Sequence, residues 1–248
     1  MIESVIQLDT GEGIQTVLAK HPDEHGPFPV VVMFHDGPGM REATHEVMRR
    51  IAQEGYYVVA PDRYHRLGEQ LHVEPAEMFK PGNEELRDQM FGWLMGTSED
   101  AVAVDLAALL AYLANDPAAT AGPRGCVGYC IGARSVLRSL KDHPEAFAAG
   151  ATLHPSFCVT EDDDSPHHVV PIFTGEIYVG IGSEDKMQSV AMNQAFLDAV
   201  NAMSDDRGLA EVHEGADHGF GVPGLAYHAV AADRSYDMIL AMFDRTLG

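Results

Sequence analysis

The chain has 248 residues, of which 46% are hydrophobic and 22% charged, and this size and composition are those of one α/β domain with a sizeable core. Its formal net charge of −22 argues against a nucleic-acid partner or an anionic membrane surface, because both favour a basic face. Three cysteines without a Cys-x-x-Cys pair, and an N-terminus without a basic and apolar leader, predict a reduced, cytoplasmic location.

Short apolar runs alternate with amphipathic segments along most of the chain. Strands are predicted at 3–9, 14–19, 29–34, 56–60, 125–129, 149–153, 176–182 and 209–214, and helices at 42–54, 98–115, 131–141, 187–203 and 224–247. The β-branched run at 29–34 is typical of a strand that is buried on both faces of a parallel sheet. The alternation predicts an α/β fold, with a mostly parallel central sheet flanked by helices on both faces.

Residues 62–97 break this alternation. They carry Pro75, Pro81 and Gly82, and a stretch of this length is too long for a structureless loop inside a compact domain. We therefore expect one domain over residues 1–248, with a short excursion at 62–97 that carries short helices over the active site.

A nucleophile motif lies between a predicted strand and a predicted helix. Gly128-Tyr129-Cys130-Ile131-Gly132 places a cysteine between glycines that sit two residues before and two after it. This spacing is typical of a nucleophile elbow, in which a tight turn presents the reactive side chain above the sheet. The following helix N-terminus favours a thiolate at Cys130. The alternative is a small buried cysteine at a tight turn.

The other members of a catalytic triad follow in the order that this kind of fold uses, which is nucleophile, acid and histidine. Asp185 follows the apolar strand at 176–182, and His218 follows the strand at 209–214. Since each candidate lies just past a strand, the three side chains are expected at one edge of the sheet. Glu184 is the second choice for the acid, and Asp217 the third.

An oxyanion site is predicted from two backbone amides. One is the amide of Ile131, which follows the nucleophile. The other is the amide of Asp36, in the glycine-containing loop His35–Gly39 that follows the third strand. The Asp36 carboxylate could also lie close to Cys130 and change its protonation. The alternative for this loop is a plain tight turn.

At this point the residues resemble the dienelactone hydrolase family of α/β-hydrolases. The resemblance rests on GYCIGA at 128–133, GADHGF at 215–220 and VVAPDRY at 58–64, and it extends from about residue 28 to the end. It implies hydrolysis of a small ester or lactone by Cys130, His218 and Asp185, without a metal or cofactor. A cysteine in the elbow is itself typical of this family.

The resemblance also implies substrate contacts. The family has an acidic residue after the third strand that holds or activates the cysteine, and Asp36 occupies that place here. One arginine of the family's carboxylate clamp corresponds to Arg87. The second, which follows the catalytic histidine, has no counterpart in Gly219–Pro223. Because a bidentate arginine is hard to replace, the resemblance predicts the hydrolase chemistry more firmly than dienelactone as the substrate.

Several other residues have a functional and a structural interpretation. Phe91, Trp93 and Phe220 are expected to form an apolar wall of the substrate pocket, or else to belong to the core. His154 and Cys158 could line the pocket or pack inside. The acidic loop at 161–164 with its two neighbouring histidines could hold a metal, but a solvated loop is the favoured interpretation, so no metal site is predicted.

The leading functional hypothesis is a carboxylic ester or lactone hydrolase that acts on a small molecule and forms a thioester acyl-enzyme on Cys130. A non-catalytic ligand-binding protein with the same fold is the first alternative. A thioesterase and a carbon–halogen hydrolase are further ones. The chain is expected to be a monomer or a homodimer.

Overall fold

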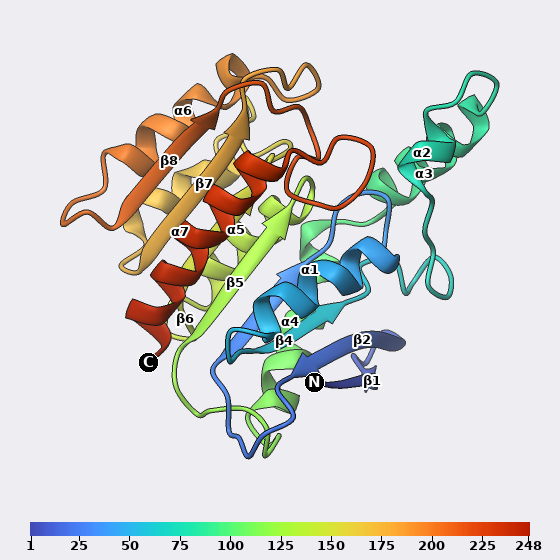
Figure 1. Cartoon of the computed structure of the whole chain (residues 1–248). Coiled ribbons are helices and arrows are strands. Elements are labelled where there is room, and N and C mark those ends of the chain that lie inside the picture. Colours follow the sequence, from blue (N-terminus) through green and yellow to red (C-terminus); the bar gives the residue numbers. More distant parts are fainter.

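A computed structural model describes all residues 1–248, and its centre is an eight-stranded sheet (Figure 1). The strands are β1 (Ile2–Asp9), β2 (Ile14–His21), β3 (Val30–Phe34), β4 (Tyr57–Pro61), β5 (Arg124–Tyr129), β6 (Phe147–Leu153), β7 (Glu176–Gly182) and β8 (Gly208–His213). Their order in the sheet is β1-β2-β4-β3-β5-β6-β7-β8. Strand β2 runs antiparallel to its neighbours β1 and β4 and all other pairs are parallel, so the predicted mostly parallel sheet is confirmed.

Helices cover both faces of the sheet, also as predicted (Figure 1). One core contains side chains of α4 (Glu99–Leu113), α5 (Gly132–Asp142) and α6 (Val190–Asn201), and the other contains those of α1 (Glu42–Ala52) and α7 (Ala229–Leu247). Strand β3 supplies both cores, because Val30, Val32 and Phe34 belong to the first and Val31 and Met33 to the second. Successive side chains of a strand point to opposite faces, and this alternation explains why β3 is apolar throughout.

The last helix begins later than the sequence suggests. A helix is predicted from residue 224, but α7 starts at Ala229, after His228 accepts a hydrogen bond from the amide of Ala231 at 3.2 Å. Gly224 has a φ of +147°, which is not helical. Residues 221–228 therefore form a loop near the carboxyl ends of the strands, and this loop is called the β8–α7 loop below.

The segment at 62–97 carries the four-residue helix α2 (Pro75–Met78) and the 13-residue helix α3 (Glu84–Gly96), which form an arm that projects from the body of the molecule (Figure 1). The arm is attached through a small apolar cluster, in which Met78, Met90 and Leu94 pack with Ile131, the residue after the predicted nucleophile. A 3₁₀ helix, η1 (Pro166–Ile172), completes the elements. None of the helices combines the length and the hydropathy that crossing a membrane requires.

Candidate active site

Cys130 sits in a sharp turn between β5 and α5. Its φ is +54°, a conformation that residues with a side chain adopt only under strain. Two hydrogen bonds to the end of β6 hold the turn: the Cys130 amide donates to the carbonyl of Leu153 at 3.1 Å, and its carbonyl accepts from the Ser156 amide at 3.0 Å. The backbone thus holds the thiol at the carboxyl edge of the sheet.

Two glycines make this turn sterically possible. A Cβ atom on Gly128 would lie 2.3 Å from the carbonyl oxygen of Gly132, and one on Gly132 would lie 2.4 Å from the carbonyl oxygen of Phe34. Both contacts are with backbone atoms, which cannot move aside as a side chain can. Strand β5, helix α5 and the end of β3 therefore approach each other closely only because these positions lack a side chain.

Asp185 and His218 meet at the ends of β7 and β8. Oδ2 of Asp185 lies 2.7 Å from Nδ1 of His218, and its Oδ1 accepts the amides of Met187 and Gln188 at 3.0 and 2.7 Å. The Asp185 side chain is fully buried. The runner-up Glu184 is exposed and makes no such contact. The ring is thereby oriented, and its Nε2 is buried without a hydrogen-bond partner of good geometry.

The thiol of Cys130 interacts electrostatically with His218. Burial tends to raise the pKa of Cys130, but the positive imidazole of His218 and a contact with Ser156 outweigh it and lower the pKa. The Oγ atom of Ser156 lies 3.3 Å from Sγ. Burial tends to lower the pKa of His218, yet the thiolate and the Asp185 hydrogen bond raise it to about 10. A thiolate–imidazolium pair is therefore the favoured state of the site.

Only one of the three thiols is expected to react with iodoacetamide near neutral pH. Burial raises the pKa of Cys126 and of Cys158, whereas the pKa of Cys130 is lowered, so its thiolate persists as the pH falls below the ordinary thiol value. The alkylation rate of Cys130 should therefore rise less steeply with pH between about pH 7 and 9 than that of an ordinary thiol. Intact-protein mass spectrometry against time measures it, and a rate that climbs about tenfold per pH unit up to pH 8.5 would contradict the ion pair.

The two predicted oxyanion amides have no acceptor within the protein. The amide of Ile131 and the amide of Asp36 both lack a hydrogen-bond partner, as does that of the neighbouring Gly37. Ile131 directly follows Cys130, the predicted nucleophile. The loop after β3 lies against the same turn, since Gly132 packs on the carbonyls of Phe34 and His35. Free amides beside the thiol can stabilise a negative oxygen that forms there.

The side chain of Asp36 is paired with an arginine that the sequence reasoning missed. Both carboxylate oxygens accept hydrogen bonds from Arg41, at 2.6 and 2.8 Å, and both side chains are buried. The Asp36 carboxylate interacts with the Cys130 thiol only electrostatically, and this interaction tends to raise the pKa of Cys130. Because Arg41 donates hydrogen bonds to both oxygens of Asp36, the guanidinium neutralises the negative charge of this carboxylate within the site. The five-residue spacing from Asp36 gave no signal for this partner.

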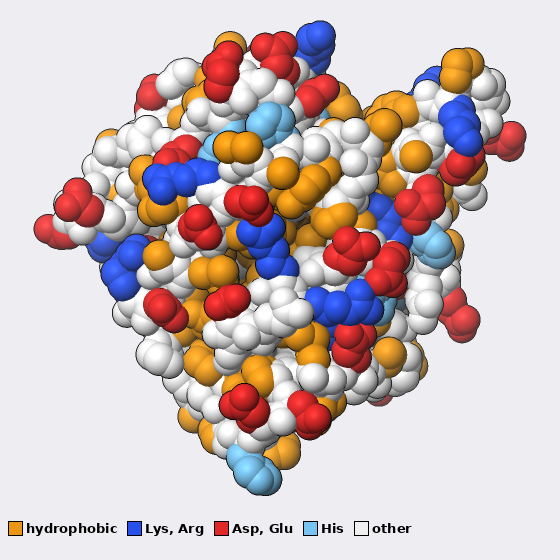
Figure 2. Space-filling model, in the orientation of Figure 1, with side chains coloured by type: hydrophobic (Ala, Val, Ile, Leu, Met, Phe, Trp, Pro, Cys, Tyr) orange, Lys and Arg blue, Asp and Glu red, His pale blue; other side chains and the backbone are white.

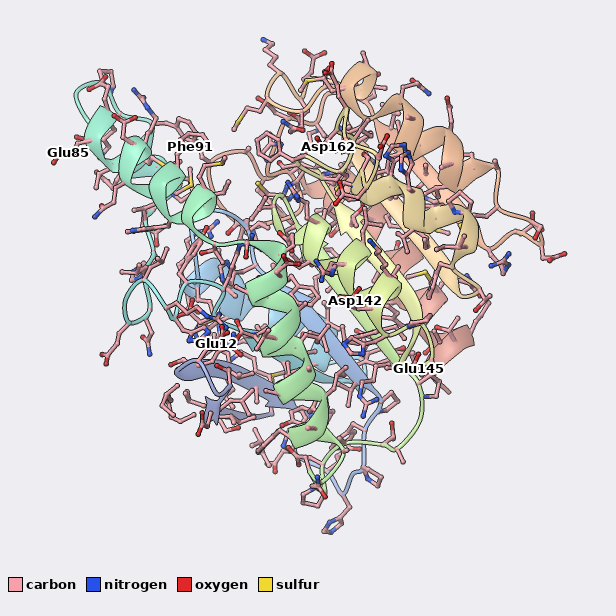
Figure 3. All side chains as sticks on the ribbon, turned by 180° about the vertical axis from the view of Figure 1, so that it is seen from behind. Glu12, Glu85, Phe91, Asp142, Glu145 and Asp162 are labelled. Atoms are coloured by element: carbon pink, nitrogen blue, oxygen red, sulfur yellow. The ribbon has the colours of Figure 1, made fainter.

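A cavity of about 530 Å³ opens above Cys130 and His218. It lies between the arm, the Asp36 loop and the β8–α7 loop, and 11 of its 25 lining residues are hydrophobic. Phe91 lines the cavity, and Figure 3 shows this residue on the side of α3 toward the body, with Glu85 at the outer end of the helix. The volume is that of a site for a small organic molecule.

Three of the predicted substrate contacts do not line this cavity. Arg87 is one turn nearer the outer end of α3 than Phe91 and lies 3.4 Å from Glu84, and Trp93 packs with Tyr64 at a ring distance of 5.9 Å. Phe220 is fully buried behind the site. Trp93 faces another side of α3 than the lining residues do, whereas Arg87 shares their side but lies farther out and pairs with Glu84. The sequence pattern alone did not determine which of these side chains reached the cavity.

His154 lines the cavity, and its neighbour Ser156 was not singled out by the sequence reasoning. His154 is fully buried at the end of β6, its ring lies edge-on to His218 at 5.1 Å, and neither ring nitrogen has a protein partner. Burial and the nearby His218 hold its pKa well below the usual range, so the ring is neutral. Cys158, by contrast, is a core residue. The position of His154 after a central strand was the signal that pointed to it, and the same signal could have found Ser156.

The acidic loop that was considered for a metal has no cluster of ligands. Ser165 Oγ lies 2.8 Å from a ring nitrogen of His167, and His168 contacts the carbonyl of Asp163 at 3.2 Å. No group of three or more His, Cys, Asp and Glu side chains in the chain is arranged to hold a metal ion. The two histidines therefore make their hydrogen bonds to other residues of the same loop.

The chain matches the dienelactone hydrolase family over residues 14–247. It is 25% identical over 234 residues to a provisionally named carboxymethylenebutenolidase of Synechocystis, covering 90% of this chain and 88% of that protein. It is 29% identical over 106 residues to the carboxymethylenebutenolidase of Pseudomonas putida, covering 43% of this chain and 42% of that one.

Two solved structures are similar over nearly the whole chain. A provisionally named dienelactone hydrolase from Klebsiella pneumoniae has a TM-score of 0.80 at 20% identity, with 98% of each chain covered. The dienelactone hydrolase from Anabaena variabilis has a TM-score of 0.69 at 16% identity, with 100% of this chain and 99% of that one covered. At these identities the likeness shows the fold, which is the α/β-hydrolase fold.

Proposed function

Because the chain belongs to the dienelactone hydrolase family and is a hydrolase of that family, we propose that it cleaves a carboxylic ester or lactone through a triad of Cys130, His218 and Asp185. The observation that carries the proposal is the geometry of the site. Cys130 lies in a strained turn beside His218, whose other nitrogen is 2.7 Å from the buried Asp185. This arrangement supplies a nucleophile, a proton carrier and a group that orients the carrier.

Acylation begins with the thiolate of Cys130. Its sulfur forms a bond to the carbonyl carbon of the ester, and the carbonyl electrons move to the oxygen, which the amides of Ile131 and Asp36 stabilise. When this tetrahedral intermediate collapses, the bond to the alcohol oxygen breaks and that oxygen takes the proton from Nε2 of His218. A thioester on Cys130 remains.

Deacylation reverses these roles. Water attacks the thioester carbonyl while Nε2 of His218 takes its proton, and the same amides hold the second oxyanion. Collapse breaks the carbon–sulfur bond, which releases the carboxylic acid and restores the thiolate–imidazolium pair. Asp185 stabilises the imidazolium in both halves through its hydrogen bond to Nδ1.

The test is the intact mass of the protein after it is mixed with p-nitrophenyl acetate. The wild type is expected to carry one acetyl group during turnover, and Cys130→Ala is expected to carry none, because it lacks the sulfur that forms the thioester. Circular dichroism shows whether the variant is folded.

Other outcomes separate the alternatives. An equal adduct on Cys130→Ala would place the nucleophile elsewhere. A folded wild type that forms no adduct and hydrolyses no ester would favour the non-catalytic ligand-binding alternative. Halide release from an ester-free halogenated substrate would indicate the carbon–halogen hydrolase instead.

A further inference from the structure

The charged side chains that line the cavity are largely neutralised by one another. Arg41 is buried, and both of its terminal guanidinium nitrogens donate hydrogen bonds to Asp36. His218 is held by Asp185 and interacts with the Cys130 thiolate. No lining side chain is therefore a buried cation that is free to bind an anion.

The only other lining charges lie at the rim. Lys186 and Asp217 are both exposed, so water screens them and neither is confined to a substrate-binding geometry. Arg87, the expected carboxylate ligand, does not line the cavity and is paired with Glu84 one turn farther out on α3. A substrate carboxylate that entered the cavity would lose its hydration without gaining a buried positive partner, and such a transfer is strongly unfavourable.

The wall of the cavity on the arm is apolar. Met78, Met90 and Leu94 are buried there, and Phe79 and Phe91 remain 47% and 40% exposed although both line the cavity. From the opposite side, the β8–α7 loop contributes Leu225, which is 63% exposed. Figure 2 shows hydrophobic side chains gathered between the arm and the body. Apolar side chains that converge on one opening mark a site for an apolar ligand.

We infer that the natural substrate is an uncharged ester or lactone with a bulky apolar part, which lies between the arm and the β8–α7 loop while its carbonyl is at Cys130. This inference rests on the proposed hydrolysis and adds the class of substrate. Methionine and phenylalanine side chains adapt to the shape of such a group. The net charge of −22 acts in the same direction, because it repels anions at long range.

The test compares two p-nitrophenyl esters of similar length on the same preparation of wild-type protein. One is the hexanoate, whose acyl chain is neutral, and the other is the monoester of glutarate, whose acyl chain ends in a carboxylate. The hexanoate is expected to have a kcat/KM at least about tenfold higher. Equal values, or a preference for the glutarate, would overturn the inference. A glutarate preference that Lys186→Gln abolished would assign carboxylate binding to Lys186 instead.

A charge placed in the apolar wall makes the test sharper. Phe91→Arg adds a cation to the cavity, and the hexanoate-to-glutarate ratio of kcat/KM is expected to fall by about tenfold. Met95→Arg is the matched control, because Met95 is on the same helix, 77% exposed and outside the cavity lining, so it adds the same charge without the contact. Its ratio should stay at the wild-type value.

The ratio compares two substrates on one protein, so partial misfolding of a variant does not change it. A ratio that Phe91→Arg leaves unaltered, or that both variants lower equally, would contradict the inferred position of the acyl chain. Failure of the hydrolysis proposal has a different signature, since neither ester would then be cleaved and Cys130 would not be acylated.

Discussion

Asp185→Asn is expected to lower kcat/KM for p-nitrophenyl acetate by about 10⁴-fold while the protein stays folded. Asp185 Oδ2 accepts a hydrogen bond from Nδ1 of His218 at 2.7 Å. This contact keeps the proton on Nδ1 and leaves Nε2 free to exchange a proton with the thiol and the leaving group. Asparagine keeps an oxygen for the amides of Met187 and Gln188, but it can place an N–H against Nδ1. The ring would then carry its proton on Nε2, and the imidazolium would lose its buried counter-charge.

Glu184→Gln is the matched control for this prediction. Glu184 is the adjacent acid, it is exposed, and it does not line the cavity, so its kcat/KM should remain near that of the wild type. Because Asp185 helps to raise the pKa of His218, Asp185→Asn should also weaken the thiolate–imidazolium pair. Iodoacetamide alkylation of Cys130 should then begin at higher pH. A loss of less than about tenfold, with an unchanged alkylation profile, would show that Asp185 does not orient the ring.

Gly128→Ala is expected to destabilise the protein by more than about 4 kcal/mol, which is a large part of the stability of a typical domain. The added Cβ would lie 2.3 Å from the carbonyl oxygen of Gly132 and 2.5 Å from its carbonyl carbon. To relieve these close contacts, β5 and α5 would have to separate. That separation would strain the hydrogen bonds that join the elbow between them to the end of β6. Urea unfolding followed by circular dichroism measures the effect, and insoluble protein would be its extreme form.

The same substitution at Gly92 provides the comparison. Gly92 lies in α3, where a Cβ would meet nothing within 4 Å, and alanine is favoured over glycine in a helix by about 1 kcal/mol. Gly92→Ala should therefore leave the urea midpoint unchanged or raise it slightly. If Gly128→Ala proved as stable as Gly92→Ala, β5 and α5 would not be packed as closely at the elbow as inferred. The steric explanation for the glycine at position 128 would then be wrong.

The arrangement of the triad could be predicted because it depends on strand ends rather than on detailed packing. Cys130, Asp185 and His218 each follow an apolar strand, and the structure places those strands, β5, β7 and β8, parallel in one sheet. The carboxyl ends of parallel strands meet at one edge, so residues far apart in the chain come together there. The choice between Glu184 and Asp185 is of another kind, because adjacent residues in a turn point in different directions and only one of them reaches the ring.

By itself the sequence determined the fold class, and it predicted the elbow motif and the order of the proposed triad, since these follow from local periodicity, turn residues and chain order. Only the tertiary structure decided what surrounds them: the pairing of Arg41 with Asp36, the pairing of Arg87 with Glu84 outside the cavity, and the approach of Ser156 to the thiol. Side-chain direction on the arm and on the loops is set by packing between distant segments. The cavity's charge and apolarity, which govern what can bind, therefore had no local signature in the chain.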